Sequence, residues 1–304
     1  MLDLKTIPFS RFGSYFAINK VDEDFYLKDM HCGDEAPFNI FKIEFYINKN
    51  KFTPKVEYSE TYLKFYDENN NNRNAIITFG LENTINILAD GLNIRLTAIK
   101  NKYDSFIFYG ENRWLYELYT KEIKFYFHEI YGQFKINSPW NMVGNDYIKI
   151  NILGEQEKTY LIIEDFTTVQ NNKSCMSFED ALSNNLSDFS LYKDKFTCKN
   201  PRYKNSFDLA TYINWSSVVR PSGILSHYAM YMSKNWMNNI WSWDNCFNAM
   251  MLKDNFIDLA LNQFEVFVEH QDEYGQYPDF INNKFKSFNC VKPPIHAFSL
   301  KKLM

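Results

Sequence analysis

The chain has 304 residues, which is enough for about two domains and a sizeable hydrophobic core. Its 33 lysines and arginines against 37 aspartates and glutamates give a formal net charge of −4. No cluster of basic residues is present that could bind the phosphate backbone of a nucleic acid, so we expect no nucleic-acid partner. Hydrophobic residues make up 45% of the chain, but no apolar run approaches the ~20 residues of a membrane span, so we expect no membrane partner.

The N-terminus and the cysteines bear on the compartment. Residues 1–5 lack the basic region and apolar stretch that mark a secretory signal. The five cysteines are scattered, with no C-x-x-C pair and no metal-like histidine spacing. We therefore predict a cytoplasmic protein with reduced thiols, no metal and no cofactor.

The first half of the chain predicts one strand after another. Apolar and polar side chains alternate over residues 41–47 and 92–98, the period that buries one face of a strand. Asp90 and Gly91 predict a tight hairpin before the second of these strands. Because no helices intervene, the strands should pair antiparallel in a large two-sheet sandwich. Further alternating runs lie at 62–66, 75–79, 106–109, 148–152 and 160–163.

Helical patterns replace the strands after about Asp165. Ser177 with Asp180 three residues later resembles a capping box at the start of a short helix. A polar stretch through residues 200–202 then leads to Tyr212. From Pro221 onward the periodicity predicts helices at 224–236, 244–252 and 255–270, a loop over 271–294 and a final helix at 295–304.

The densest chemical signal is a tryptophan cluster at the junction of two predicted helices. Trp236, Trp241 and Trp243 fall within eight residues and are followed by Asp244. An indole face can stack on a sugar ring, and a neighbouring carboxylate can accept hydrogen bonds from vicinal hydroxyls. The alternative is that the tryptophans pack in a core and that Asp244 caps a helix.

A second group of candidate residues lies on the predicted loop and at the start of the last helix. Gly275 and Pro278 set a turn beside Asp279, and Pro294 delays the helix that carries His296 in its first turn. Such loops often carry binding residues. The alternatives are a satisfied buried histidine at 296 and a solvated or turn-stabilising carboxylate at 279.

Three motifs in this order resemble a known family. The W-x-W-D run at 241–244, the G-x-x-P-D run at 275–279 and the K-P-P-I-H-A-F run at 292–298 are similar to those of mannosylglycerate-hydrolase-like glycoside hydrolases, the family 63 group of the six-hairpin glycosidase superfamily. Residues 8–15 also resemble the opening of bacterial members that carry a sandwich before the catalytic domain.

The resemblance implies a β + α multidomain fold, an antiparallel β-sandwich followed by part of an (α/α)6 toroid. It places a sandwich domain at 1–170, a helical and irregular linker at 171–221, and the N-terminal part of the glycosidase domain at 222–304. The family cleaves α-glycosidic bonds with inversion, using one carboxylic acid and one carboxylate. The implied substrate-binding residues are Trp241, Trp243, Asp244, Asp279 and His296.

The resemblance also implies that the catalytic acid and base lie beyond Met304. In the family the acid lies in a later E-S-G-x-D segment, whereas the Ser-Gly pair at 222–223 precedes the W-x-W-D run. Twelve helices need about 200 residues, and roughly eighty follow Pro221. We therefore expect a truncated chain with about a third of the toroid. Asp244 and Asp279 would lack the closed, desolvated site that a general acid needs.

Three functions follow as hypotheses. The first is the sugar-gripping portion of a hydrolase acting on α-glucosides, α-mannosides or glucosylglycerate-like substrates, without turnover by this chain alone. The second is a non-catalytic carbohydrate-binding protein, in which the sandwich or the tryptophan cluster binds glycan. The third is an inactive gene remnant whose exposed apolar helix faces favour aggregation or a complementing C-terminal fragment as partner.

Overall fold

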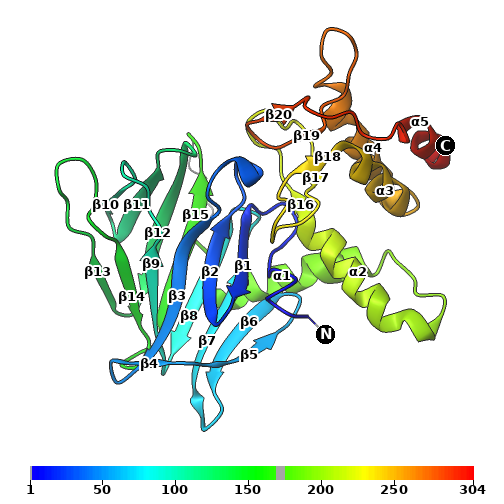
Figure 1. Ribbon diagram of the computed structural model, residues 1–304. Coiled ribbons are helices and arrows are strands. Elements are labelled where there is room, and N and C mark those ends of the chain that lie inside the picture. Colours follow the sequence, from blue (N-terminus) through cyan, green and yellow to red (C-terminus); the bar gives the residue numbers. More distant parts are fainter. Residues whose placement is uncertain (1, 169–174) are drawn as a thin grey trace.

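The computed structural model describes residues 2–168 and 175–304. A β-sandwich occupies one side of the molecule, and the helices gather on the other side (Figure 1). The expected limit between sandwich and linker, at residues 170 and 171, lies outside the described residues.

The first sheet has seven strands within the described residues, in the order β1-β2-β3-β9-β14-β13, with β4 paired to β3. Neighbouring strands pair antiparallel. The strands are β1 (Phe16–Val21), β2 (Asp24–Asp29), β3 (Asn39–Ile47), β4 (Asn50–Phe52), β9 (Asn93–Ala98), β13 (Phe134–Asn137) and β14 (Lys149–Leu153).

The second sheet has eight strands within the same described ranges, in the order β10-β11-β12-β15-β8-β7-β6-β5. It too is antiparallel. Its strands are β5 (Lys55–Tyr58), β6 (Tyr62–Asp67), β7 (Asn70–Phe79), β8 (Thr84–Asp90), β10 (Ser105–Gly110), β11 (Arg113–Leu118), β12 (Ile123–Tyr131) and β15 (Thr159–Phe166).

One apolar core lies between the two sheets. On β3, Phe41 and Phe45 are buried, and their rings meet Phe127 and Phe65 of the other sheet at centroid distances of 5.5 and 4.5 Å. The alternation that predicted these strands therefore reflects one face covered by the opposite sheet. The prediction of a large antiparallel two-sheet fold is confirmed.

The predicted hairpin at Asp90 and Gly91 is wrong. Gly91 has the expected positive φ of 71°, but β8 and β9 belong to different sheets. Ile87 and Ile94 are both buried in the shared core, because the chain crosses from one sheet to the other at this turn. Burial of both strands in one core decides the pairing, and a turn dipeptide alone does not.

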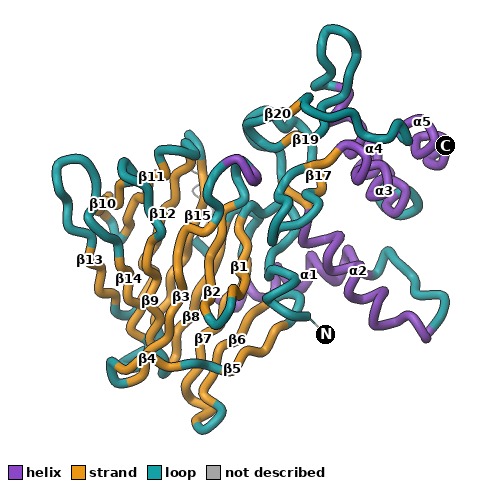
Figure 2. Tube along the Cα trace, viewed as in Figure 1, coloured by secondary structure: helices purple, strands orange, loops and turns teal. Residues whose placement is uncertain are grey.

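Helix α1 (Phe178–Lys193) covers part of the outer face of the second sheet. The expected cap is present, because the Asp180 backbone N–H donates to Ser177 Oγ at 3.0 Å. Phe178 packs with Tyr160 and Ile162 of β15. Figure 2 shows the change from strand to helix at this point of the chain.

A helix that the sequence patterns did not predict follows the polar stretch. The 3₁₀ turn Pro201–Tyr203 leads into α2 (Lys204–Ser217), which buries Tyr212 and Trp215. The Tyr212 hydroxyl accepts a hydrogen bond from the Ser10 backbone N–H at 3.2 Å. Helix α2 thereby ties the N-terminal segment to the helical part.

The predicted helix at 224–236 is wrong. The segment is irregular apart from β17 (Ala229–Met230), which pairs with β16 (Val218–Val219). Its Lys234 ammonium is buried and donates to Ser10 Oγ and to three backbone carbonyl oxygens. These tertiary contacts hold the backbone out of a helix despite its favourable periodicity.

The remaining predicted helices are confirmed. α3 (Ser242–Leu252) packs against α4 (Ile257–Val268) and α5 (His296–Leu303). The loop between α4 and α5 also contains strands β19 (Phe280–Ile281) and β20 (Lys286–Ser287), which join β18 (Ile240–Trp241) in a small sheet. The described residues contain no complete toroid of helices. None of these helices combines the length and apolarity needed to cross a membrane.

Candidate functional site

The small sheet joins the two groups of candidate residues. β18 pairs antiparallel with β19, so Trp241 lies opposite Phe280 with ring centroids 5.0 Å apart. The Ser242 backbone N–H then donates to the Asp279 carbonyl at 3.0 Å. Trp241 and Asp279, distant in sequence, therefore meet at the start of α3.

Lys292 contacts both of these residues, a role that no sequence pattern predicts. Its Nζ lies 3.1 Å from Asp279 Oδ1 and 4.7 Å from the ring centroid of Trp241. Asp279 is only 5% exposed, which contradicts the interpretation as a solvated carboxylate. Lys292 begins the K-P-P-I-H-A-F run, but its place before two prolines carries no signal of an ion pair with a residue thirteen positions earlier.

Asp244 lies in the first turn of α3 and does not cap it. The helix starts at Ser242 with Trp241 as its cap residue, and the Asp244 carboxylate benefits from the helix dipole. Burial raises the pKa of Asp244, whereas Lys292 and a hydrogen bond from Trp243 oppose the rise. Asp279 acts in the opposite direction to Lys292 and raises the pKa of Asp244.

Trp243 packs on its own helix. Its ring meets Phe247 edge-on at a centroid distance of 5.8 Å. Phe247 and Asp244 line a small cavity of about 180 Å³ together with Tyr231. Trp236, the remaining tryptophan of the cluster, is 65% exposed and is therefore not part of a core.

His296 opens α5 and packs on Tyr277 with ring centroids 4.8 Å apart. Burial lowers the pKa of His296, and a hydrogen bond to the backbone of Ser242 opposes that effect. Its Nε2 is buried without a hydrogen-bond partner among the described residues, as is the indole Nε1 of Trp241. His296 is thus not a fully satisfied buried histidine.

These residues offer complementary hydrogen-bonding groups. The indole N–H of Trp241 can only donate, and the Nε2 of a neutral His296 whose other nitrogen donates can accept. A hydroxyl group both donates and accepts, so it can pair with either of these groups, and Asp244 adds a carboxylate acceptor. No three histidine, cysteine or acidic side chains gather as a possible metal site within residues 2–168 and 175–304.

Comparison with known proteins gives structural matches only. No family model matches the chain, and no curated protein matches it significantly in sequence. A solved structure described as "Putative kojibiose phosphorylase from human microbiome" superposes with a TM-score of 0.60 at 9% identity, covering 94% of this chain and 51% of that one.

Two further solved structures are similar. A bacterial glucoamylase in complex with acarbose has a TM-score of 0.54 at 10% identity, over 93% of this chain and 53% of its own. The glycosyl hydrolase ccman5, of family 92, has a TM-score of 0.57 at 8% identity, over 98% of this chain and 51% of its own. The chain thus shares the fold of glycosidase and phosphorylase domains and spans about half the length of these proteins.

Proposed function

We propose that the chain provides the sugar-gripping residues of an inverting α-glycoside hydrolase of the family 63 group, acting on α-glucosides, α-mannosides or glucosylglycerate-like substrates. Trp241, Trp243, Asp244, Asp279 and His296 would bind the sugar, with Lys292 holding Asp279 in place. The fold shared with glycosidases and phosphorylases supports this proposal.

One observation carries the proposal. Trp241 Nε1 and His296 Nε2 are both buried and have no hydrogen-bond partner among the described residues. Leaving such groups unpaired costs free energy, which a sugar hydroxyl would recover. The nearby carboxylate of Asp244 would accept from an adjacent hydroxyl.

Titration with maltose, followed by calorimetry, tests the site. Trp243→Ala should weaken binding at least about tenfold, because a stacked aromatic face and a hydrogen-bonding neighbour of Asp244 are lost. The same substitution at the exposed Trp140, far from the site on the sandwich, should leave binding unchanged. Equal losses in both variants, or no binding of maltose, α-mannobiose or glucosylglycerate, would contradict the proposal.

Asp244→Asn provides an independent test. It removes a carboxylate acceptor while keeping the side-chain size, and we expect a loss of about tenfold in sugar affinity. Asp254→Asn, at an exposed position just after α3, is the matched control. We expect no release of sugar from α-glucosides by this chain, and turnover that disappears in Asp244→Asn would show that the site is catalytic in its own right.

A second candidate is carbohydrate binding without hydrolysis, and the ion pair between Asp279 and Lys292 fits it as well. A carboxylate already engaged by an ammonium group is poorly placed to activate water. A site derived from an α-glycosidase should bind maltose more tightly than its β-linked isomer cellobiose. Equal affinity for the two isomers would favour the second candidate.

A further inference from the structure

A separate cavity lies where the sandwich meets the segment that follows α2. Its volume is about 540 Å³, within the usual range for small-molecule pockets. The end of β15, the turn between β7 and β8, and residues 220–223 form its walls. None of the five residues proposed to bind the sugar near α3 lines this cavity.

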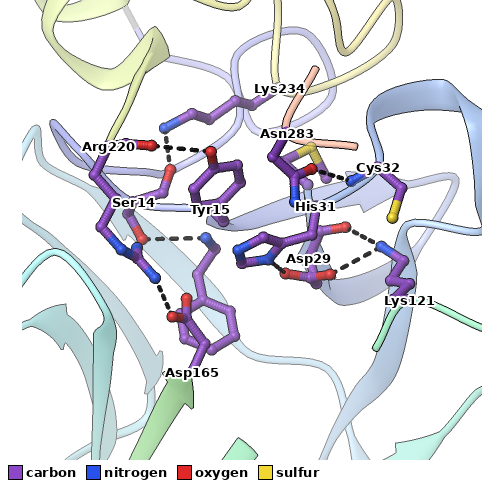
Figure 3. Close-up of polar contacts among 12 residues, drawn as sticks. Ser14, Tyr15, Asp29, His31, Cys32, Lys121, Asp165, Arg220, Lys234 and Asn283 are labelled. Carbon is purple, nitrogen blue, oxygen red and sulfur yellow. Dashed lines mark hydrogen bonds and ion pairs between the residues drawn. The ribbon is translucent and has the colours of Figure 1, made fainter. Parts of the chain in front are cut away.

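Asp165 lines this cavity and has one carboxylate oxygen without a donor among the described residues. It is 1% exposed, and its Oδ1 forms an ion pair with Arg220, but its Oδ2 is buried with no hydrogen bond among the described residues (Figure 3). A buried carboxylate oxygen without a donor is costly. Asp165, a residue of the cavity wall, therefore keeps an acceptor oxygen that an O–H or N–H group of a ligand could satisfy.

Arg220 cannot recruit an anion, because its charge is already matched. Its guanidinium pairs with Asp165 and also donates to the carbonyl oxygens of Gly13 and Glu82 at 3.3 and 3.2 Å. The ring of Tyr15 packs beneath it, with the guanidinium carbon 5.2 Å from the ring centroid. These contacts fix Arg220 in position.

The charges behind the cavity are also paired. His31, which lines the cavity, holds Asp29 Oδ1 through Nδ1 at 2.6 Å, and Lys121 donates to Asp29 Oδ2 at 2.9 Å. His31 stacks on Tyr15 with ring centroids 3.8 Å apart (Figure 3). Both buried aspartates face a cation, and the carboxylate of Glu82, which also lines the cavity, accepts from the Tyr228 hydroxyl at 3.0 Å. An anionic ligand would therefore meet no free cation among the described residues of the wall.

The remaining walls suit a hydroxylated ring. Phe166 lines the cavity; one face of its ring stacks on Tyr126 at a centroid distance of 4.5 Å, and the other face could pack on the C–H face of a sugar. Asn83 and Ser222 line it as well and supply polar groups that both donate and accept. We propose that this cavity is a binding site for a small neutral polyhydroxy compound, a monosaccharide or polyol, with one hydroxyl donating to Asp165 Oδ2.

Calorimetric titration of the full chain with D-glucose and with glycerol tests the proposal, with acetate and tetramethylammonium as charged comparators. Ser222→Phe should fill the half-buried cavity wall and weaken binding of the neutral ligand at least about tenfold. Ser206→Phe, the same substitution at an exposed position of α2, should leave it unchanged. Asp165→Asn should give a similar loss where the variant folds, and Ser222→Phe tests the site without disturbing the ion pair.

A crystal soaked in D-glucose locates the ligand and separates this site from the one at α3. Ligand in this cavity, with a hydroxyl at Asp165, that persists in Asp244→Asn supports the proposal. A cavity that holds only water at saturating glucose overturns it. Binding that Ser222→Phe leaves unchanged, tighter binding of acetate or tetramethylammonium, or the absence of saturable binding overturns it as well.

Discussion

The sandwich and the helical part use their apolar residues differently. In the sandwich, alternating side chains from both sheets meet in one core, as Phe41 and Phe127 do. Helix α4 instead buries Leu259 and Phe267 but leaves Leu261 37% exposed, and α5 leaves Phe298 58% exposed. The two sheets bury each other's apolar faces, whereas the described helices leave some of their apolar side chains exposed.

The largest expected effect tests the sandwich core. Phe41→Ala removes a fully buried ring and should lower the free energy of unfolding by about 4 kcal/mol, because of lost burial and the cavity left behind. The same substitution at the exposed Phe298 should cost less than about 1 kcal/mol. Urea denaturation of both variants measures the contrast, and similar losses would mean that Phe298 is covered in solution.

The buried ion pair between Asp29 and Lys121, which both belong to the sandwich, should matter almost as much. Lys121→Met leaves Asp29 buried without its lysine, and burial alone would then raise the pKa that Lys121 and His31 now hold at about 2. We expect a loss on the order of 3 kcal/mol in unfolding free energy. Lys124→Met on β12 serves as control. It removes an exposed ion pair with Glu117 of β11 and should cost less than about 1 kcal/mol.

A third prediction concerns the outer face of the second sheet, where the sandwich also buries a charge. Burial lowers the pKa of His128, but hydrogen bonds to Cys175 and Glu164 outweigh it and raise the pKa to about 9. Because the folded value exceeds the unfolded one of about 6.5, the stabilisation is complete below pH 6.5 and is lost as pH rises toward 9.

Urea titrations from pH 6 to pH 9.5 measure this effect. The unfolding free energy should fall by on the order of 2 kcal/mol across that window, and most of the fall should disappear in His128→Gln. An unchanged pH dependence in His128→Gln would assign the effect to other groups. NMR titration of the His128 ring gives the pKa directly.

The sandwich could be predicted further from sequence than the helical part, for a physical reason. Residues 41–47 alternate because one sheet covers the other, so the local pattern and the tertiary environment agree. Residues 224–236 have helical periodicity, but the buried Lys234 takes its acceptors from distant segments. Such contacts cannot be inferred from a local pattern.

The candidate site, too, could be predicted only as far as local sequence patterns reach. Its motifs pointed to Trp241 and Asp279, and the pairing of β18 with β19 brings them together. The role of Lys292 depends on where the loop folds back, and the free acceptor oxygen of Asp165 depends on the end of β15 and on Arg220. α2 was missed although Tyr212 and Trp215 have helical spacing, because polar residues surround them.

The smallest expected effect decides whether the exposed helix face is free in solution. Leu261→Gln exchanges a partly exposed apolar side chain for a good helix former and should change the unfolding free energy by no more than about 0.5 kcal/mol. Leu259→Gln, two residues earlier on the buried face of α4, should cost several times more. A loss above about 1 kcal/mol in Leu261→Gln that grows with protein concentration would mean that a second molecule covers this face, since association adds stability by mass action.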